Sequence, residues 1–523
     1  MAQALRAGAW SEALRAGYHP LYPLAIVATQ RVVPDWESAA ALISIAGGTA
    51  SVALLFLFLR DAFGEPAAWA GAALLAVHSR AIDYGSDVQS DGLYAALLLG
   101  GLWLGWRALR TRSARLAAAA GLASGLAYAT RPEGLELATV LGLLALLEAV
   151  RGPWISAAPG RFALRRCALW LAALGAGAAV VVVPYALLLE RATGAWSLTP
   201  KRSVARLVAP LAAPPEPRAL PPARRPDPPL WSAYLEPPPA ASIDPEAIAI
   251  DEREDGMAVL VARTPASRAY AAAKMLARTA KSSMRYGVLA LVLLGLAAAR
   301  GRPGPRGRFL GVLWTTHLGL LYVFTFAIGY VSRRHTLPAL LPALGYAGLG
   351  AAAAGAWIQT RARMLWRGGG LARATEAPAR STEGSAAPRW SPVATLLVAA
   401  VAAGELARQI PPRRGEELAG RRAAEWLHEH APAVAPVAAT RLRLGYYARM
   451  PYVPLGGVAD AALGPYLARA GARYVVLDEP GRVAAVAGAS GLRVEPLQHF
   501  EAGGGEAWVF ELSEERAEPA TGR

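Results

Sequence analysis

Two shortages in the sequence, of cysteine and of charged residues, each exclude a class of protein. Cys167 is the single cysteine, so no internal disulfide can form, and its position at the start of an apolar run indicates a small buried side chain. Only 18% of the 523 residues are charged and 54% are hydrophobic, whereas soluble domains carry about a quarter charged residues. With a mean hydropathy of +0.29, this composition favours a protein of the lipid bilayer.

The charges that are present are mostly arginines. Lys201, Lys274 and Lys281 are the lysines of the chain, and Lys plus Arg outnumber Asp plus Glu by 54 to 38, which gives a net charge of +16. A basic chain could bind nucleic acid, but these arginines fall in short groups between apolar runs rather than on one face with interleaved aromatic residues. They therefore indicate membrane topology, and no nucleic-acid partner is predicted.

Nearly charge-free apolar runs recur along the chain, and several are shorter than the roughly 20 residues of a perpendicular span. The runs are Ala39 to Leu59, Ala67 to His78, Gly92 to Trp106, Leu116 to Thr130, Leu135 to Leu147, Cys167 to Leu189, Tyr286 to Ala299, Phe309 to Tyr330, Leu337 to Ile358 and Val393 to Gly404. They predict about ten spans and hence a predominantly α-helical, polytopic transmembrane bundle.

Arginine-rich loops set the orientation. Loops over 107–115, 151–166 and 300–308 contain arginines and no acids, and a fourth basic loop, 359–391, is rich in Gly, Ala and Ser. Arginine excess in short loops marks the cytoplasmic side of a membrane. The other side then receives an acidic loop before residue 91, a basic SRRH stretch and the C-terminal region, so we predict a multi-pass protein of the inner (plasma) membrane.

Composition divides the chain further. Proline is frequent in 190–285 and excludes regular helix there, which predicts an extracytoplasmic loop, and after 411 helix and strand signals alternate, which predicts a small extracytoplasmic α/β domain. The chain is predicted to begin with an outer amphipathic loop, 1–36, and the first part of the bundle, 37–189. The Pro-rich loop, 190–285, and the second part of the bundle, 286–358, follow. The remaining segments are a disordered cytoplasmic loop, 359–391, a last transmembrane helix, 392–410, and the α/β domain, 411–523.

Three groups of polar residues on the predicted outer face could carry chemistry. The first is YHPLYP, in which prolines bracket His19 and Tyr22 just before an apolar segment. This rigid, non-helical entry would hold both side chains at the membrane interface, where they could bind a substrate. The alternative is an interfacial aromatic anchor without a chemical role.

The second group is acidic. Asp83, Asp87 and Asp91 are spaced four residues apart, which would place them on one face of a helix. Such a cluster could position sugar hydroxyls, act as a general base, or hold a divalent cation at Asp87 and Asp91, the one cofactor considered. The alternative is a solvated acidic loop in which Asp91 caps the next helix.

The third group is basic: Arg131, followed by Glu133, and then Arg333, Arg334 and His335. Arginines on an outer face depart from the positive-inside bias, and a phosphate at the membrane surface would explain them, because guanidinium groups bind phosphate with two hydrogen bonds. The alternative is that Arg131 pairs with Glu133 or with lipid head groups.

The order of these motifs resembles one group of membrane enzymes. YHPLYPL, SDVQSDGLY, GLASGLAYATRPEGL and RRHTLPALLP follow one another within residues 11–358. They resemble the protein O-mannosyltransferase and aminoarabinose-transferase group of the C-type membrane glycosyltransferase superfamily. The resemblance implies sugar transfer from a polyprenyl-phosphate-linked donor, by inverting displacement on the extracytoplasmic face, to an envelope glycan, lipid or protein.

The resemblance also implies roles for the motifs. Arg131, Arg333 and Arg334 would hold the lipid phosphate and stabilise the charge of the leaving group. The family's catalytic aspartate follows a first transmembrane helix, and neither precedes His19 here. That base is therefore expected upstream of Met1, with Glu12 as the acid available in its place.

Two other functions compete with a transferase. A lipid or solute transporter would show internal repeats or ionisable residues within its spans, and Glu136 and His317 are the notable ones. A non-catalytic relative could act as a scaffold in envelope assembly, binding a partner through its outer domain.

Overall fold

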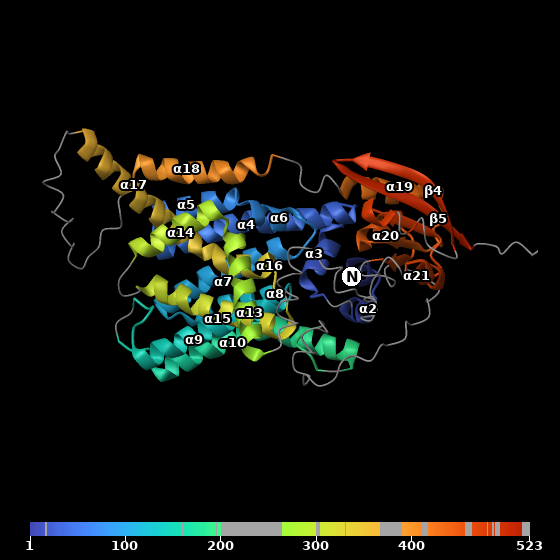
Figure 1. The fold of residues 1–523 in the computed structure, drawn as a ribbon. Helices are drawn as coiled ribbons and strands as arrows, with labels where there is room; N and C mark the ends of the chain where they lie inside the picture. The colour runs from blue at the N-terminus through green and yellow to red at the C-terminus, as the bar shows by residue number, and fades with distance from the viewer. Residues whose placement is uncertain are drawn as a thin grey trace, which may run out of the picture.

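A helical bundle and a smaller domain with a β-sheet make up the chain (Figure 1). The computed structural model describes residues 1–15, 18–157, 160–194, 196–199, 264–299, 304–329, 331–366, 390–410, 417–455, 463–478, 480–483, 486 and 492–514.

The helices of the bundle follow the chain in order, with two short 3-10 turns, η1 and η5, between them. They are α1 (Ala2–Arg6), α2 (Trp10–Arg15), α3 (Leu21–Thr29), α4 (Trp36–Phe63), α5 (Glu65–Ala76), α6 (Ser79–Ser86), α7 (Asp91–Thr111), α8 (Ala114–Tyr128), η1 (Pro132–Gly134), α9 (Leu135–Arg151), α10 (Leu164–Thr193), α13 (Pro265–Met284), α14 (Tyr286–Ala298), α15 (Pro305–Ile328), α16 (Arg333–Leu340), η5 (Leu341–Ala343), α17 (Leu344–Trp366) and α18 (Pro392–Ala407).

Each of the ten apolar runs overlaps a helix of this bundle. Among the residues that the structure describes, five helical stretches are long and apolar enough to cross a membrane, and the number is six if the bent pair α13 and α14 counts as one span. The other apolar helices are shorter; α5, for example, has 12 residues and rises about 18 Å, less than the roughly 30 Å hydrocarbon core. The chain is thus a mostly helical multi-pass protein, and a count of about ten spans stays a prediction.

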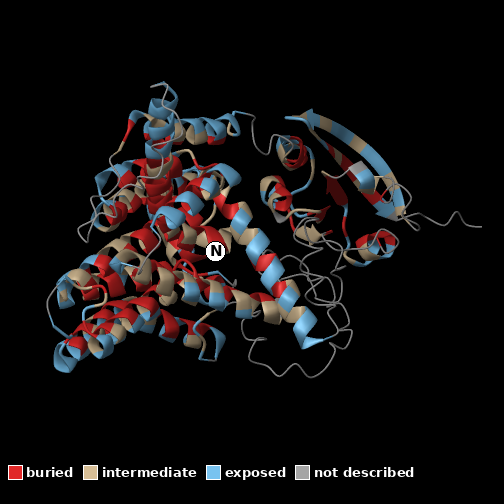
Figure 2. Ribbon diagram, turned by 60° about the vertical axis from the view of Figure 1, so that its left-hand side comes forward, coloured by how far each residue is buried: buried red, intermediate tan, exposed pale blue. Residues whose placement is uncertain are grey.

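Apolar side chains on the outside of the bundle fit a lipid surround. Only 17% of the most apolar part of α10 is buried within the protein, and Leu169, Val180 and Val183 are each more than half exposed. In Figure 2 the buried positions gather on the inner sides of the packed helices and the exposed ones on the outer sides. Helices of a soluble protein would present polar residues there.

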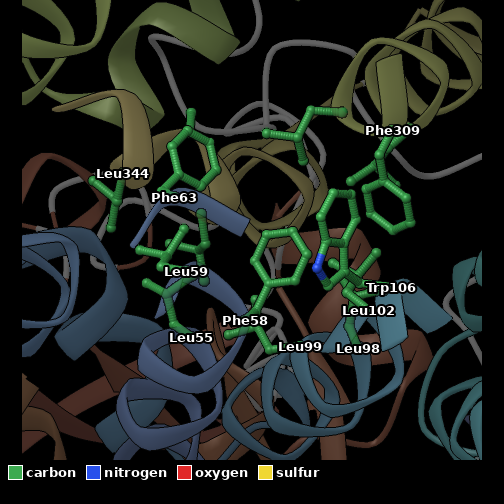
Figure 3. Packing of buried hydrophobic residues seen from close by; sticks show 14 of the residues in the cluster. Leu55, Phe58, Leu59, Phe63, Leu98, Leu99, Leu102, Trp106, Phe309 and Leu344 are labelled. Carbon is green, nitrogen blue, oxygen red and sulfur yellow. The ribbon is translucent and has the colours of Figure 1, made fainter. Parts of the chain in front are cut away.

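The interior of the bundle is filled by large apolar side chains from α4, α7, α15 and α17 (Figure 3). At its centre the rings of Phe58, Trp106 and Phe309 contact one another, with ring centroids 5.4–6.3 Å apart and mostly edge to face. This geometry is favourable because the positive edge of one ring meets the negative face of the next. The core fixes the relative positions of the helices that carry the polar residues described below.

Two glycines allow α4 and α7 to pack closely. A Cβ atom added at Gly47 would lie 2.6 Å from the backbone of Gly92, and one added at Gly92 would collide with the backbone oxygen of Ser44. Small residues permit such close backbone contact between membrane helices. The hydroxyl of Ser44 donates to the carbonyl of Gln89 at 3.0 Å, which ties α4 to the turn before α7. The beginning of α7, including Asp91, is therefore held firmly against α4.

A buried carboxylate joins the last bundle helix to the start of α6. Glu405 on α18 accepts hydrogen bonds from the backbone N–H and the hydroxyl of Ser79, at 3.2 and 2.7 Å. Its other oxygen accepts from Arg408 at 2.8 Å and lies 3.6 Å from Arg285. Only 1% of Glu405 is exposed, so this contact links segments 326 residues apart in the interior.

The chain bends by 100° between α13 and α14. Arg285 forms the bend with φ 58° and ψ 149°, a backbone conformation that a residue with a side chain adopts at a cost of about 1–3 kcal/mol. Surrounding contacts must hold this conformation, and the ion pair with Glu405 is one of them.

The C-terminal domain has a five-stranded sheet in the order β2-β1-β3-β5-β4. β1 is parallel to β2 and β3, whereas β5 is antiparallel to both β3 and β4. Separate hydrophobic clusters, one including α19 and α20 and the other α21, pack against it. The elements are α19 (Glu417–His430), β1 (Val437–Ala439), α20 (Leu442–Ala448), β2 (Tyr452–Pro454), α21 (Leu463–Arg469), β3 (Tyr474–Leu477), η8 (Pro480–Arg482), β4 (Leu492–Ala502) and β5 (Gly505–Glu514).

This domain contacts the beginning of α4. Glu37 accepts a hydrogen bond from Tyr447 at 3.0 Å and pairs with Arg421 at 3.2 Å. The domain thus lies at the end of the bundle where α4 begins, and Figure 1 shows α19, α20 and the sheet together on one side of the bundle.

Several predicted boundaries need correction. The segment 1–36 contains three helices rather than a loop, and α10 extends to Thr193. The predicted Pro-rich loop, 190–285, ends in helix α13, while 200–263 lies outside the described residues. α17 continues to Trp366, so helix occupies the first part of the predicted cytoplasmic loop, 359–391.

Glu405→Ala tests the link between α18 and α6. We expect it to lower the free energy of unfolding by about 3 kcal/mol, because the change leaves buried polar partners without their carboxylate. Equilibrium unfolding in detergent micelles measures this. Glu425→Ala, which removes an exposed pair with Arg421, is the control and should cost less than about 1 kcal/mol. Equal effects of the two changes would contradict the structural role of Glu405.

Candidate functional site

A buried aspartate between two arginines forms the centre of the site. Asp91, 4% exposed, is the first residue of α7. One carboxylate oxygen pairs with Arg131 and the other accepts a hydrogen bond from Arg334 at 2.6 Å. The three residues come from the start of α7, the residue before η1 and the start of α16, so the structure brings together the predicted acidic and basic groups. Hydrogen-bonded charge pairs of this kind are strong because both partners are ionised.

Arg131 lies behind Asp91, away from solvent. It is 5% exposed, its guanidinium lies 5.3 Å from the ring centre of Tyr94, and it also pairs with Glu133 at 3.4 Å. Burial alone would lower the pKa of Arg131, but the carboxylates of Glu133 and Asp91 reverse this and raise it. The predicted alternative, a pair between Arg131 and Glu133, is present, and the pair with Asp91 is present beside it.

Glu133 and His335 continue the polar network. The Nδ1 atom of His335 accepts from the backbone N–H of Ser332 at 3.2 Å, so the neutral ring carries its hydrogen on Nε2. That atom lies 3.8 Å from Glu133. His335 thereby fixes the first turn of α16, from which Arg334 extends toward Asp91.

A second buried pair contacts the backbone of the first turn of α16. His317 on α15 and Glu136 on α9 lie 2.7 Å apart, between Nδ1 and Oε2, and Nε2 of His317 lies 3.0 Å from the backbone oxygen of His335. A carbonyl oxygen can only accept, so Nε2 carries a hydrogen. A second hydrogen must lie between Nδ1 and Oε2. Whether it resides on the ring or on the carboxyl group, the pair has no net charge, which suits its burial.

An apolar cavity opens beside Asp91 and Arg334. Its volume is about 750 Å³, and its wall comes from α4, α5, α6, α7, α16 and η5. Asp91 and Arg334 are the charged residues in this wall, which is otherwise dominated by side chains such as Val52, Phe56 and Leu337. Ligand cavities commonly combine an apolar lining with a few polar groups. This cavity suits a long apolar molecule with an anionic group next to Arg334.

The three acids do not share one helical face, contrary to prediction. α6 ends at Ser86, and Asp87 to Ser90 interrupt the helix before Asp91. Asp83 pairs with Arg80 at 3.7 Å, Asp87 accepts from its neighbour Val88 at 3.0 Å, and Asp91 faces the arginines. The N-cap of α7 is Ser90, so the alternative role of Asp91 as a cap is also wrong.

The cation alternative does not fit this arrangement. Both oxygens of Asp91 already bind guanidinium groups, which would repel a divalent ion. Within the described part of the chain, no three His, Cys, Asp or Glu side chains gather in a way that could hold a metal ion.

His19 and Tyr22 are both buried, but they point to different neighbours. His19 packs against Tyr128 and Tyr185, with ring centres 5.2 and 5.5 Å away. The hydroxyl of Tyr22 donates to the backbone oxygen of Ala40 at 3.0 Å and lies 2.8 Å from the hydroxyl of Ser44. Neither residue lines the cavity. The structure therefore gives Tyr22 a packing role next to the α4 and α7 contact.

The two remaining candidates lie outside the cavity wall. Glu12 is exposed on α2, a helix that contacts α10, and it does not line the cavity. Arg333 also faces elsewhere: its Nε donates to the hydroxyl of Ser282 on α13 at 3.0 Å.

Sequence reasoning missed Tyr94 and did not connect Glu136 and His317 to the site. Tyr94 is three residues after Asp91 on an apolar helix, where an aromatic residue carries no signal of its own. Two ionisable residues in apolar runs were a usable signal, because such residues need a partner inside a membrane.

One family model and several solved structures match this chain. Residues 18–186 match the family model described as dolichyl-phosphate-mannose-protein mannosyltransferase. The structure resembles ArnT from Cupriavidus metallidurans, in the apo state and bound to undecaprenyl phosphate, each with a TM-score of 0.50 and 14% identity over 97% of this chain and 91% of that chain. An oligosaccharyltransferase from Archaeoglobus fulgidus aligns with a TM-score of 0.40 and 12% identity over 91% of this chain and 61% of that one.

No curated protein matches the chain by sequence. The likeness to ArnT shows a shared fold, and the family match covers all three polar motifs of the first half of the chain. The resemblance to the C-type membrane glycosyltransferase superfamily, predicted from the order of four motifs, is thus confirmed.

Asp91→Ala tests the centre of the site. We expect it to lower the free energy of unfolding by about 3–5 kcal/mol, because Arg131 would stay buried with fewer compensating charges. Unfolding in detergent micelles measures the loss. Asp87→Ala, a change four residues away in the turn, should cost less than about 1 kcal/mol, and a similar loss for both would count against the ion-pair network.

Glu136→Ala and Glu136→Gln test the pair with His317. The alanine variant should lose about 3 kcal/mol of stability, because it leaves the buried imidazole without a partner. Glutamine can still hydrogen-bond Nδ1 and should recover most of that loss. Thr139→Ala, at an exposed position of the same helix, controls for effects on α9. No difference between alanine and glutamine would refute the hydrogen-bond assignment.

Proposed function

We propose that this chain is an integral membrane glycosyltransferase. It takes a sugar from a polyprenyl-phosphate-sugar donor and transfers it to a glycan, lipid or protein of the cell envelope on the extracytoplasmic face of the membrane. The observation that carries the proposal is the apolar cavity of about 750 Å³ with Arg334 and Asp91 as its charged residues.

The two ends of such a donor match the two parts of this site. A polyprenyl chain is a flexible hydrocarbon, and burying it in the apolar wall is favourable for the same reason that membrane spans are buried. The phosphate needs a cation, and Arg334 supplies a guanidinium that is about one-third exposed. ArnT bound to undecaprenyl phosphate has this fold, which supports a donor of the same class.

The arginines play unequal parts in this proposal. Arg334 contacts the donor phosphate, whereas Arg131 is buried behind Asp91 and holds the carboxylate in place. Asp91 in turn orients Arg334 through two contacts, at 2.6 and 3.4 Å. A guanidinium oriented before the reaction stabilises developing charge without having to reorganise.

The reaction that this geometry supports is a displacement at the anomeric carbon. The acceptor oxygen forms a bond to that carbon while the carbon–oxygen bond to phosphate breaks, and its electron pair stays on the phosphate oxygen beside Arg334. The configuration inverts because attack comes from the opposite side. The acceptor proton passes to a general base, for which the resemblance predicts an aspartate.

The position of the site supports an extracytoplasmic placement. The turn before α7 contacts α4 near its beginning, and the C-terminal domain contacts that beginning through Glu37. The site and the domain thus share one end of the bundle. The acid-free arginine loops, which mark the cytoplasm, follow the other ends of α7 and α9. We therefore place both the site and the C-terminal domain outside the inner membrane.

The experiment uses the purified full-length chain and a panel of polyprenyl-phosphate hexoses and pentoses with labelled sugars. Release of water-soluble label, with and without envelope extract as acceptor, measures transfer. Arg334→Gln should lower the rate about a hundredfold, the usual scale for losing one preorganised charge-stabilising group, and should weaken the binding of sugar-free undecaprenyl phosphate.

The control is Arg361→Gln, an exposed arginine near the far end of α17, which should leave both measurements unchanged. Binding of undecaprenyl phosphate without release from any donor would favour the scaffold alternative. Equal release by Arg334→Gln and the unaltered chain would overturn the assignment of the phosphate to Arg334.

A further inference from the structure

Two consecutive arginines at the start of α16 face different neighbours. Arg334 extends to Asp91 on α7, whereas Arg333 extends to Ser282 on α13. Successive residues of a helix point about 100° apart, so adjacent side chains can serve separate sites. Arg333 contributes to a second basic group, made of Arg80, Arg285 and Arg333 and called here the outer arginine cluster.

The outer arginine cluster joins three distant parts of the chain. Arg80 is in the first turn of α6, Arg285 forms the bend between α13 and α14, and Arg333 begins α16. Burial and the nearby charge of Arg333 lower the pKa of Arg80, and Arg285 adds to the effect. Geometry agrees with this: Glu405 contacts both Arg285 and Ser79, the neighbour of Arg80, while Arg333 reaches Ser282, three residues before Arg285.

The carboxylates nearby satisfy this cluster incompletely. Asp83 lies 3.7 Å from Arg80 and Glu405 lies 3.6 Å from Arg285, both beyond hydrogen-bond distance. Glu405 is also shared with Ser79 and Arg408. Among the residues that the structure describes, no carboxylate lies within 4.0 Å of Arg333.

Hydrogen-bond donors without partners also indicate that the cluster binds an anion. The Nε atoms of Arg80 and Arg285 are buried and have no hydrogen-bond partner in the described part of the chain. Buried donors are normally satisfied, and a planar guanidinium matches the oxygens of a phosphate with two parallel hydrogen bonds. Arg285, in addition, keeps a backbone conformation that is unfavourable for a residue with a side chain, a feature that concentrates at ligand-binding positions.

The surface next to the cluster is apolar. α14 begins immediately after Arg285, and its exposed residues include Tyr286 at 75%, Leu293 at 55% and Leu294 at 48%. A molecule with its anionic group at Arg285 could lay hydrocarbon chains along this helix. A free inorganic anion has no apolar part to pack on that surface, whereas the acyl chains of a membrane lipid can pack on it.

We propose that Arg80, Arg285 and Arg333 bind the phosphate of an anionic membrane phospholipid whose acyl chains lie along α14. This lipid is separate from the glycosyl donor, whose phosphate belongs to Arg334 on a different face of α16. By pairing with Arg333 the lipid holds the first turn of α16, and hence Arg334, in position. The site would link the composition of the membrane to the geometry of the cavity mouth.

Native mass spectrometry of the full chain in detergent tests the proposal without any donor or acceptor, so its outcome is independent of the transferase assay. The probes are phosphatidylglycerol and phosphatidylcholine with identical acyl chains. The unaltered chain should retain phosphatidylglycerol preferentially. The double variant Arg80→Gln and Arg333→Gln should reduce that occupancy about tenfold, as expected for the loss of charge-assisted hydrogen bonds, and leave phosphatidylcholine unchanged.

Two further variants separate the sites. Arg334→Gln should keep most of the bound phosphatidylglycerol, and Arg361→Gln should keep all of it. If Arg334→Gln removes the lipid and the double variant does not, the lipid occupies the donor cavity and the proposal is wrong. If millimolar inorganic phosphate displaces the lipid completely, the cluster recognises phosphate alone and the role of α14 is refuted. Equal retention of the two lipids by the unaltered chain would also overturn the proposal.

Discussion

The need to neutralise charge inside an apolar bundle governs the arrangement of the site. Asp91 and Arg131 are both almost fully buried, and either charge alone would be costly at this depth. Their pairing, with Arg334 and Glu133 completing the network, forces the beginning of α7, the turn before α9 and the beginning of α16 to meet. The position of each helix end is thus dictated by the partners of its charged residue. The cavity lies beside this meeting point.

Much of the architecture could be predicted from apolar run length. The run from Cys167 to Leu189 became α10, Leu164 to Thr193, and each other run also overlaps a helix, because lipid and protein interiors both require the backbone to satisfy its own hydrogen bonds. Which short helices cross the membrane could not be predicted in this way. A helix of 12 to 17 residues can be completed by a neighbour or buried in the bundle, and packing decides between these.

The sequence was enough to single out the candidate residues, but not to predict which of them contact one another. Asp91, Arg131 and Arg334 were each singled out, yet their partners lie 40 and 243 positions apart, and sequence spacing carries no information on such distances. Where spacing was used, it misled: the four-residue interval of Asp83, Asp87 and Asp91 suggested one helical face, but the helix ends at Ser86. That Arg333 and Arg334 contact different helices could also be learned only from the structure, because their adjacency in the sequence does not indicate their partners.

The contact of Glu405 with Ser79 has a consequence for how the molecule is made. Ser79 begins the helix that forms one wall of the cavity, but its carboxylate partner is synthesised 326 residues later. At about 5–20 residues per second, a ribosome needs on the order of tens of seconds to cover that distance. During this interval the start of α6 lacks its partner, although every residue of the cavity wall has been synthesised by Leu341. Fixing α6 in place is therefore a late event in biogenesis, and a nascent chain that stops before α18 carries the cavity residues without the contact that secures them.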